Sequence, residues 1–321
     1  MKIVCLGGGT GLSTLLEGLK KLPGLDLVGI PTMFDSGGHS GELRDKYGIL
    51  PPGDIRAVIT ALAGNTEVGE TCRVIFTHRE GADSLGNVLL QVLESRFGFA
   101  EAARRICQLV GAVGKAVPVS LDICHIVAEL EDGTVIRGEA NIYSREQERL
   151  VPIKRVRLEP PAAANPEALD ELAGASLIVL GPGDLFTSII PNLLVKGVPE
   201  AIARSPAPVL HICNLMSRRS ETHGFSVCDF VHRIEQYLGA RVDAAMYNTR
   251  MPSDQLAQAY WEKEGAHPVL FDPAEADNDH LWIGGELLSE EGDLIRHDPD
   301  RLANAVLAYA LAQHLNIFSR H

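Results

Sequence analysis

Three glycine-rich segments, each following an apolar run, hold the residues of this sequence that are best placed to do chemistry. The first is GGGTG at 7–11, before a helical pattern. Glycines in such a turn let backbone N–H groups approach an anion at the positive end of a helix. The spacing fits neither a Walker A loop nor the dinucleotide fingerprint, because no Gly-Lys follows and Leu12 or Thr14 stands where the last glycine would be. We expect a phosphate-binding turn of neither standard type; a tight turn without a ligand is the alternative.

The second segment is MFDSGGHSGELRDKYGILPPGDIR at 33–56, which is long for a connection between a strand and a helix. We expect it to be a loop that lines a ligand cleft, with Asp35 and Asp54 reaching the same cleft from its two ends. The alternative is a surface loop in which Arg44 pairs with a nearby acid. The residues of this segment that we expect to contact a ligand are Asp35, Gly37, Gly38, Ser40, Arg44 and Asp54.

The third segment is LGPGDLFTSIIPNLL at 180–194. Its glycines permit close backbone approach, and its polar side chains stand near the start of a helix. Asp184 or Thr187 could instead cap that helix. Ligands of open α/β sheets bind where the strand order reverses, so three such segments together favour a nucleotide or phosphate site. The candidate ligand-binding residues here are Gly181, Gly183, Asp184, Thr187 and Ser188.

The elements between these segments alternate between strand and helix. This alternation predicts an α/β fold with a doubly wound, mostly parallel, Rossmann-like sheet. Asp-Gly at 132–133 joins the extended segments 118–130 and 135–142, which predicts a β-hairpin excursion at about 118–142. Because no Gly/Ser/Pro linker separates the halves, we expect a single nucleotide-binding domain over 1–321. The periodicity predicts strands at 2–6, 27–32, 176–180, 208–212 and 242–246, and helices at 12–21, 54–63, 84–97, 101–109, 198–204, 225–238, 253–264 and 300–314.

Composition excludes several classes of partner. With 29 basic and 42 acidic residues the net charge is −13, which argues against non-specific nucleic-acid binding. No apolar stretch is long enough to predict a membrane span, and Met1-Lys2 leads straight into a strand, which predicts no secretory signal. The six cysteines form no C-x-x-C pair, so we expect reduced thiols and a cytoplasmic protein. No His or Cys pairs stand at zinc-ligand spacing, so zinc is not expected.

Taken together, the segments resemble the CofD-like family over about residues 2–316. That family contains the gluconeogenesis factors, which bind UDP-sugars, and the 2-phospho-L-lactate transferases, which make a deazaflavin cofactor. The runs ETHGFSVCDFV and IRHDPDRLA are similar to the gluconeogenesis-factor branch. The resemblance is carried by GGGTGLSTLLEGLK (7–20), DSGGHSGELRD and GILPPGDIR (35–56), SLGNVLL (84–90), LEDGTVIRGEANI (130–142), GPGDLFTSIIPNLL (181–194), CNLMSRRSETHGFSVCDFV (213–231) and LIRHDPDRLA (294–303).

The resemblance also implies roles for individual residues. It places a nucleotide diphosphate over the first glycine turn and near 181–188, with Tyr260 positioned to meet the uracil ring and Arg296 to meet the nucleotide. Ser36 stands where the family commonly has Asp, so no metal ion is assigned, although Mg²⁺ is left open. His39 and Glu42 also depart from the family pattern. The further ligand-binding residues implied are Gly8, Gly9, Thr10, Gly11, Leu12, Asn87, Pro182 and Asn214.

No nucleophile motif such as G-x-S-x-G is present, which favours binding over catalysis. We therefore expect a regulatory protein that binds a nucleotide sugar, or another nucleotide diphosphate, and is linked to central carbon metabolism and to cell shape or envelope. The alternative is a transferase that moves a phospholactyl group from a nucleotide carrier to a deazaflavin. An NAD-linked enzyme is a third hypothesis, which the failed fingerprint opposes. A homodimer is left open.

Overall fold

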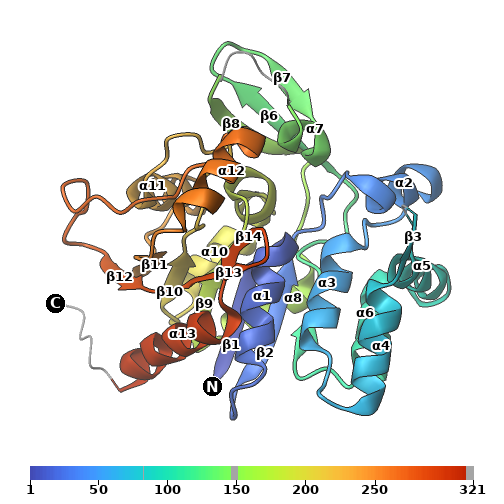
Figure 1. Ribbon diagram of the computed structural model, residues 1–321. Coiled ribbons are helices and arrows are strands. Elements are labelled where there is room, and N and C mark those ends of the chain that lie inside the picture. The colour runs from blue at the N-terminus through green and yellow to red at the C-terminus, as the bar shows by residue number, and fades with distance from the viewer. Residues whose placement is uncertain (82, 146–150, 316–321) are drawn as a thin grey trace.

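The centre of the protein is a seven-stranded parallel sheet, seen in a computed structural model that describes residues 1–81, 83–145 and 151–315 (Figure 1). The strand order is β12-β11-β10-β9-β1-β2-β5, so the chain builds outwards from β1 in one direction and then from β9 in the other. The topological switch point therefore lies between β1 and β9. These strands are β1 (Lys2–Gly7), β2 (Asp26–Pro31), β5 (Lys115–Ala116), β9 (Leu177–Leu180), β10 (Val209–Ile212), β11 (Ala244–Asn248) and β12 (Leu281–Gly285).

The central strands are apolar throughout because helices cover both faces of the sheet. β1 pairs with β2 on one side and β9 on the other, with Cys5 opposite Gly29 and Val179. On one face, α1 (Gly9–Leu19) packs between α3 (Gly53–Leu62) and α13 (Pro299–His314). On the other, α10 (Val198–Arg204) lies between α8 (Pro166–Ala173) and α11 (Val227–Leu238). The predicted doubly wound α/β fold is confirmed.

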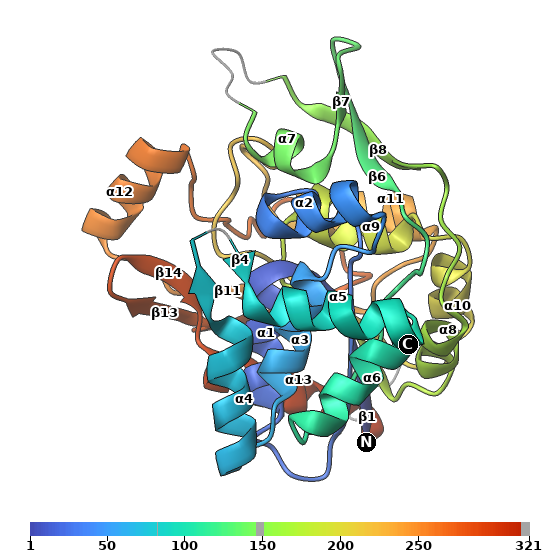
Figure 2. The ribbon, with the colours of Figure 1, turned by 90° about the vertical axis from the view of Figure 1, so that its right-hand side faces the viewer.

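Three further helices form the side of the protein that faces the viewer in Figure 2. They are α4 (Glu67–Thr77), α5 (Leu85–Phe97) and α6 (Phe99–Leu109), and α5 packs against the other two. A short hairpin, β3 (Arg79–Glu80) with β4 (Asp83–Ser84), joins α4 to α5. The sequence predicted α5 and α6 but not α4, whose apolar side chains are partly exposed: Val74 is 69% exposed.

The predicted excursion is present and larger than expected. β6 (His125–Leu130) and β7 (Val135–Arg137) form the expected hairpin, and β8 (Ile153–Glu159) adds a third antiparallel strand against β6. The second extended segment was predicted to run to residue 142, but β7 ends at Arg137 and α7 (Glu139–Tyr143) begins two residues later. The small sheet stands above the carboxyl-terminal edge of the central sheet in Figure 1.

The segment 33–56 is not simply a loop, which corrects the expectation from its polar composition. It contains α2 (Gly38–Tyr47), which ends at Gly48 with a left-handed φ of 64°. Few apolar residues mark this helix, so its pattern gives no helical stripe. The remaining elements are the π-helical turn η1 (Leu185–Ile189), α9 (Ile190–Leu193), α12 (Asp254–Glu264), β13 (Leu288–Glu291) and β14 (Leu294–His297). Across the described ranges, every helix is too short or too polar to span a bilayer.

Candidate functional site

A cleft with two chambers lies over the switch point, at the carboxyl ends of β1, β9 and β10. The first chamber has a volume of about 510 Å³ and lies between the α1 turn, the segment after β9 and β14. The second chamber, of about 670 Å³, lies between α1, α2, α3 and α5. A common wall joins them, so one extended ligand can reach both. The wall consists of Gly9, Thr10, Asp35, Asp54, Glu139 and Tyr143.

The first glycine turn is shaped by close packing as well as by its place beside the cleft. A Cβ at Gly11 would collide with the Pro182 carbonyl oxygen, and one at Gly8 would lie 2.6 Å from Thr32 Cγ2. Gly9 has a φ of 60°, and its N–H donates to Asp54 Oδ1 at 2.9 Å. The first turn of a helix leaves its N–H groups without helical partners, so those of Thr10 and Gly11 are left for a ligand.

Leu12 differs from the other residues implied for this turn. Its side chain is completely buried in the hydrophobic core and lines neither chamber. The structure therefore gives it a packing role beneath the turn, as its place on the apolar face of α1 suggests.

The segment after β9 is held by partners that the sequence did not reveal. Gly183 N donates to Asn214 Oδ1 at 3.0 Å. The carboxylate of Glu221 accepts from Phe186 N at 2.9 Å and from the Thr187 hydroxyl at 2.8 Å. Glu221 therefore takes the capping role that the alternative hypothesis gave to Asp184 or Thr187. Burial raises the pKa of Glu221 to about 8, and the charge of Asp184 adds to that shift.

Asp184 instead pairs with Arg218, which connects the cleft to the excursion. Arg218 Nε lies 3.1 Å from Asp184 Oδ2, and its guanidinium lies 4.1 Å from the centre of the Tyr143 ring on α7. Burial opposes the charge of Arg218, but Asp184 and Tyr143 outweigh it and raise the pKa. These contacts place a fixed positive charge beside Ser188, Pro182 and Asn214 in the first chamber.

Three carboxyl groups line the wall that the two chambers share. Burial raises the pKa of Asp54 to about 7, and the neighbouring charge of Asp35 adds to the shift. Burial likewise raises the pKa of Asp35, and it raises that of Glu139 to about 7. Asp35 and Asp54, predicted to reach one cleft from the two ends of a segment, do line the same wall.

The acidic wall is positioned by backbone contacts. Asp35 Oδ1 accepts from Gly37 N at 2.7 Å, and Ser36 Oγ accepts from Ala140 N at 2.9 Å, which ties the segment to α7. In the described part of the chain, no three His, Cys, Asp or Glu side chains are arranged as a metal site. Two or three carboxylates beside a phosphate site still match the way Mg²⁺ is usually held, with phosphate and water completing the shell.

Tyr260 and Arg296 lie together at the rim of the first chamber. The Tyr260 hydroxyl accepts from Ile295 N at 2.9 Å, and its ring packs in a small cluster with Leu215 and Ile295. Arg296 follows Ile295 on β14, is exposed, and has no hydrogen-bond or ion-pair partner among the residues that the structure describes. Tyr260 thus fixes the strand that presents Arg296.

The second chamber contains the rest of the predicted site except Leu12, Arg44 and Gly181; Gly181 lines neither chamber and precedes Pro182 with a left-handed φ of 87°. Gly37, Gly38, Ser40 and Asn87 line it, and Asn87 Nδ2 lies 3.4 Å from Ser40 Oγ. Arg44 is buried and lines neither chamber. It donates to the Asp35 carbonyl oxygen at 3.2 Å and to Asp45 Oδ1 at 3.0 Å. The alternative hypothesis of an ion pair is therefore right for Arg44.

Several residues of the cleft were not singled out from the sequence. Glu139, Arg218 and Glu221 lie in runs that carried the family resemblance, and Tyr143 follows one of them, but nothing in their spacing distinguished them from surface residues. Arg56 follows Asp54 by two positions, on the helix that begins beside the cleft. Only the packing of α7 and of the 214–221 segment over the switch point brings Glu139, Tyr143 and Arg218 to the first chamber, while Arg56 lines the second and Glu221 is buried behind the segment after β9.

This fold and this cleft define a Rossmann-like protein with a nucleotide-type site at the switch point. The model of the family described as 2-phospho-L-lactate transferase CofD matches residues 3–283, and the chain belongs to that family. It is 38% identical over 316 residues to the gluconeogenesis factor of Bacillus subtilis, with 95% of this chain and 97% of that protein covered. It is 36% identical to the gluconeogenesis factor of Halalkalibacterium halodurans, with 95% of each covered.

Solved structures agree with these relationships. A crystal structure of a Bacillus halodurans protein superposes with a TM-score of 0.89 at 36% identity and covers 95% of this chain and 98% of that chain. The family and fold predicted from the sequence are confirmed, and the relatives bear the name of the gluconeogenesis-factor branch.

Proposed function

We propose that this protein binds a UDP-sugar in the first chamber and acts as a regulatory protein of the gluconeogenesis-factor type, without turning the ligand over. The single observation that carries the proposal is the first chamber itself, where a helix N-terminus, a fixed Arg218 and an unpaired Arg296 surround one cavity at the switch point. Free N–H groups and guanidinium groups are the donors that a diphosphate requires. The cytoplasm is the compartment we propose for it, as for its metabolic ligand.

A cation fits the acidic wall. Asp35 and Asp54 supply the hard oxygen ligands that Mg²⁺ prefers, and burial raises the pKa of both carboxyl groups. When bound, Mg²⁺ would neutralise charge on the diphosphate. Asp54 already accepts the first N–H of α1, so a phosphate placed beside it requires a proton or a cation between the two anions.

Calorimetric titration with UDP-N-acetylglucosamine tests the proposal. Tyr260→Ala should bind about three- to tenfold more weakly, since it removes the ring that we place against uracil. Tyr260→Phe is the matched control. It keeps the ring but removes the hydroxyl that holds Ile295, so an equal loss in both variants would assign the effect to β14 and not to stacking.

Arg296→Ala should lose more affinity than Tyr260→Ala, and its deficit should shrink at high salt because screening already weakens the native contact. Overnight incubation followed by chromatography should return the nucleotide sugar unchanged. Steady release of UDP would replace the regulatory function by an enzymatic one. Heat with GDP or a deazaflavin, but with no uridine nucleotide, would favour the transferase instead.

A further inference from the structure

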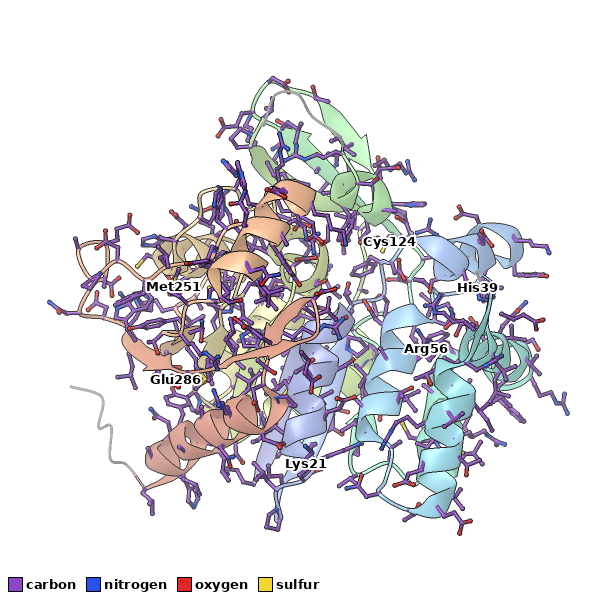
Figure 3. The ribbon with its side chains drawn as sticks, viewed as in Figure 1. Lys21, His39, Arg56, Cys124, Met251 and Glu286 are labelled. Carbon is purple, nitrogen blue, oxygen red and sulfur yellow. The ribbon has the colours of Figure 1, made fainter. Side chains whose placement is uncertain are left out.

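Two arginines line the second chamber, Arg56 on α3 and Arg79 on β3. In Figure 3, Arg56 lies beside α3 and His39 lies at α2, on the same side of the molecule. Among the described side chains, no carboxylate lies within 4.0 Å of either guanidinium. The chamber therefore contains positive charge without a direct ion pair.

Arg56 is held in one orientation by neutral groups. Its Nε donates to Asn87 Oδ1 at 2.8 Å, and its Nη1 donates to the Phe76 carbonyl oxygen at 3.0 Å. These acceptors fix the guanidinium plane but do not neutralise it. Its second terminal nitrogen, Nη2, has no partner among the described residues and is not enclosed, so it faces the chamber.

The electrostatic surroundings make this arrangement unfavourable without a ligand. Burial lowers the pKa of Arg56, and the like charge of Arg79 lowers it further. Asp54 and Asp35 oppose that shift from a distance, but they stand at the shared wall and not beside the guanidinium. Two like charges that converge in a cavity are stabilised when an anion binds between them.

We propose that the second chamber binds a carboxylate carried by the sugar of the nucleotide ligand, so that the preferred ligands are acidic nucleotide sugars. This inference rests on the proposed function, because the diphosphate on the glycine turn anchors the ligand. Gly9 and Thr10 line both chambers, so a sugar attached to that diphosphate enters the second chamber past the acidic wall. Nη2 of Arg56, whose guanidinium is held by Asn87 and the Phe76 carbonyl, is left to donate a charge-assisted hydrogen bond to a carboxylate, and Arg79 supplies the second guanidinium.

UDP-glucose and UDP-glucuronic acid form a matched pair of probes, because they differ only by a hydroxymethyl group and a carboxylate on the sugar. Calorimetry at fixed pH and salt should show about tenfold tighter binding of the acid. Arg79→Gln should remove this preference, measured as the ratio of the two affinities within the same variant, and should leave the fold intact because Arg79 is exposed. Arg56→Lys keeps the charge but not the guanidinium, so it should reduce the preference in part.

Arg96→Gln is the matched control, since it removes the same charge from an exposed position on α5 that lines neither chamber. It should retain the preference. Equal affinity for the two sugars in the native protein, or a preference that survives Arg79→Gln, would overturn the inference while leaving the proposed function intact. Binding of neither sugar would instead defeat the proposed function.

Discussion

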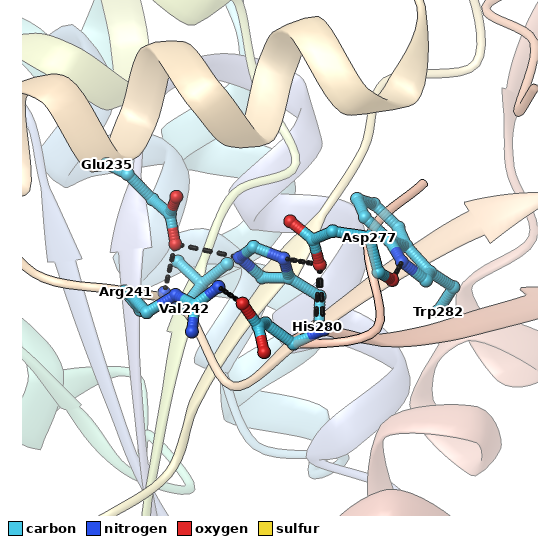
Figure 4. Close-up of polar contacts among 7 residues, drawn as sticks. Glu235, Arg241, Val242, Asp277, His280 and Trp282 are labelled. Carbon is cyan, nitrogen blue, oxygen red and sulfur yellow. Dashed lines mark hydrogen bonds and ion pairs between the residues drawn. The ribbon is translucent and has the colours of Figure 1, made fainter. Parts of the chain in front are cut away.

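Two clusters of charged side chains lie at opposite edges of the sheet, and they differ in whether the chain itself supplies partners for the charges. At the edge where β11 and β12 begin, His280 is enclosed between two carboxylates (Figure 4). Its Nδ1 lies 2.7 Å from Asp277 Oδ1 and its Nε2 lies 2.8 Å from Glu235 Oε1. Burial acts to lower the pKa of His280, but these two hydrogen bonds outweigh it and raise the value above its usual range.

The acidic wall of the cleft, at the other edge, lacks such partners. Burial raises the pKa values of Asp35, Asp54 and Glu139, and the charge of Asp35 adds to the shifts of Asp54 and Glu139. The His280 cluster is complete within the chain, whereas the wall is complete only with a proton, a cation or a ligand. The first cluster therefore has the form of a structural charge pair, and the second is the place where we propose that the ligand binds.

Breaking the complete cluster should have the largest effect on stability. His280→Ala should lower the free energy of unfolding by about 2–4 kcal/mol, because it leaves Glu235 and Asp277 facing each other without a cation. Urea denaturation measures this loss. The affinity for UDP-N-acetylglucosamine should be unchanged, since the cluster lies at the far edge of the sheet.

Arg241→Gln is the control for that variant. Arg241 pairs with Asp279 at 2.6 Å beside His280, but both side chains are exposed, so the urea midpoint should not move measurably. A similar loss in both variants, or weaker nucleotide binding in His280→Ala, would contradict the assignment of this cluster to stability.

Removing one charge from the acidic wall should raise stability and weaken nucleotide binding. Asp54→Asn keeps an oxygen that can accept the Gly9 N–H but removes a charge that burial disfavours, so stability at pH 8 should rise by about 1 kcal/mol. Affinity for the nucleotide in Mg²⁺ should fall about tenfold, because a ligand of the cation is lost. Asp170→Asn, on an exposed acid of α8 that lines neither chamber, should change neither quantity. Loss of stability in Asp54→Asn would place Asp54 with the structural charges.

The two clusters should lose their contributions to stability in different pH ranges. Folded-state pKa values of about 7 for Asp54 and Glu139 exceed the unfolded values, so the stability they contribute is present at low pH and lost as pH rises from about 4 to 7. The raised pKa of His280 gives a contribution that is full below about pH 6.5 and lost as pH rises through the folded value.

Denaturation at several pH values, expressed as differences from the native protein, measures these windows. Asp54→Asn should reduce the fall in the free energy of unfolding between about pH 4 and 7. His280→Ala should reduce the fall that occurs at higher pH. Changes in the opposite windows would mean that other groups carry the dependence.

The comparison also shows why the sequence predicted one part of the site better than another. Five of the seven central strands, β1, β2, β9, β10 and β11, and most helices were predicted because buried apolar runs and amphipathic stripes carry their own signal, as Leu12, Leu15, Leu16 and Leu19 do for α1. Polar elements such as α2 carry no such signal. Its helix depends on the left-handed Gly48 and on contacts that only the assembled fold supplies.

Within the site, glycine turns and the carboxylates beside them could be predicted because their residue types limit what they do. Glu139, Arg218 and Arg56 could not, because their roles depend on which elements meet over the switch point. Arg44 shows the converse: its sequence context suggested a ligand contact, but its hydrogen bonds are made within its own segment.

The number of protons exchanged on ligand binding tests most directly whether a nucleotide sugar binds against the incomplete acidic wall. Calorimetry with UDP-N-acetylglucosamine at pH 7, repeated in buffers of different ionisation enthalpy, counts those protons. With Mg²⁺ present, binding should release about one proton, since Asp54 and Glu139 with pKa values of about 7 give up protons to a cation. In EDTA binding should take up protons, and Asp54→Asn should reduce both exchanges. Tight binding with no proton exchange under either condition would place the ligand away from the wall and contradict the account.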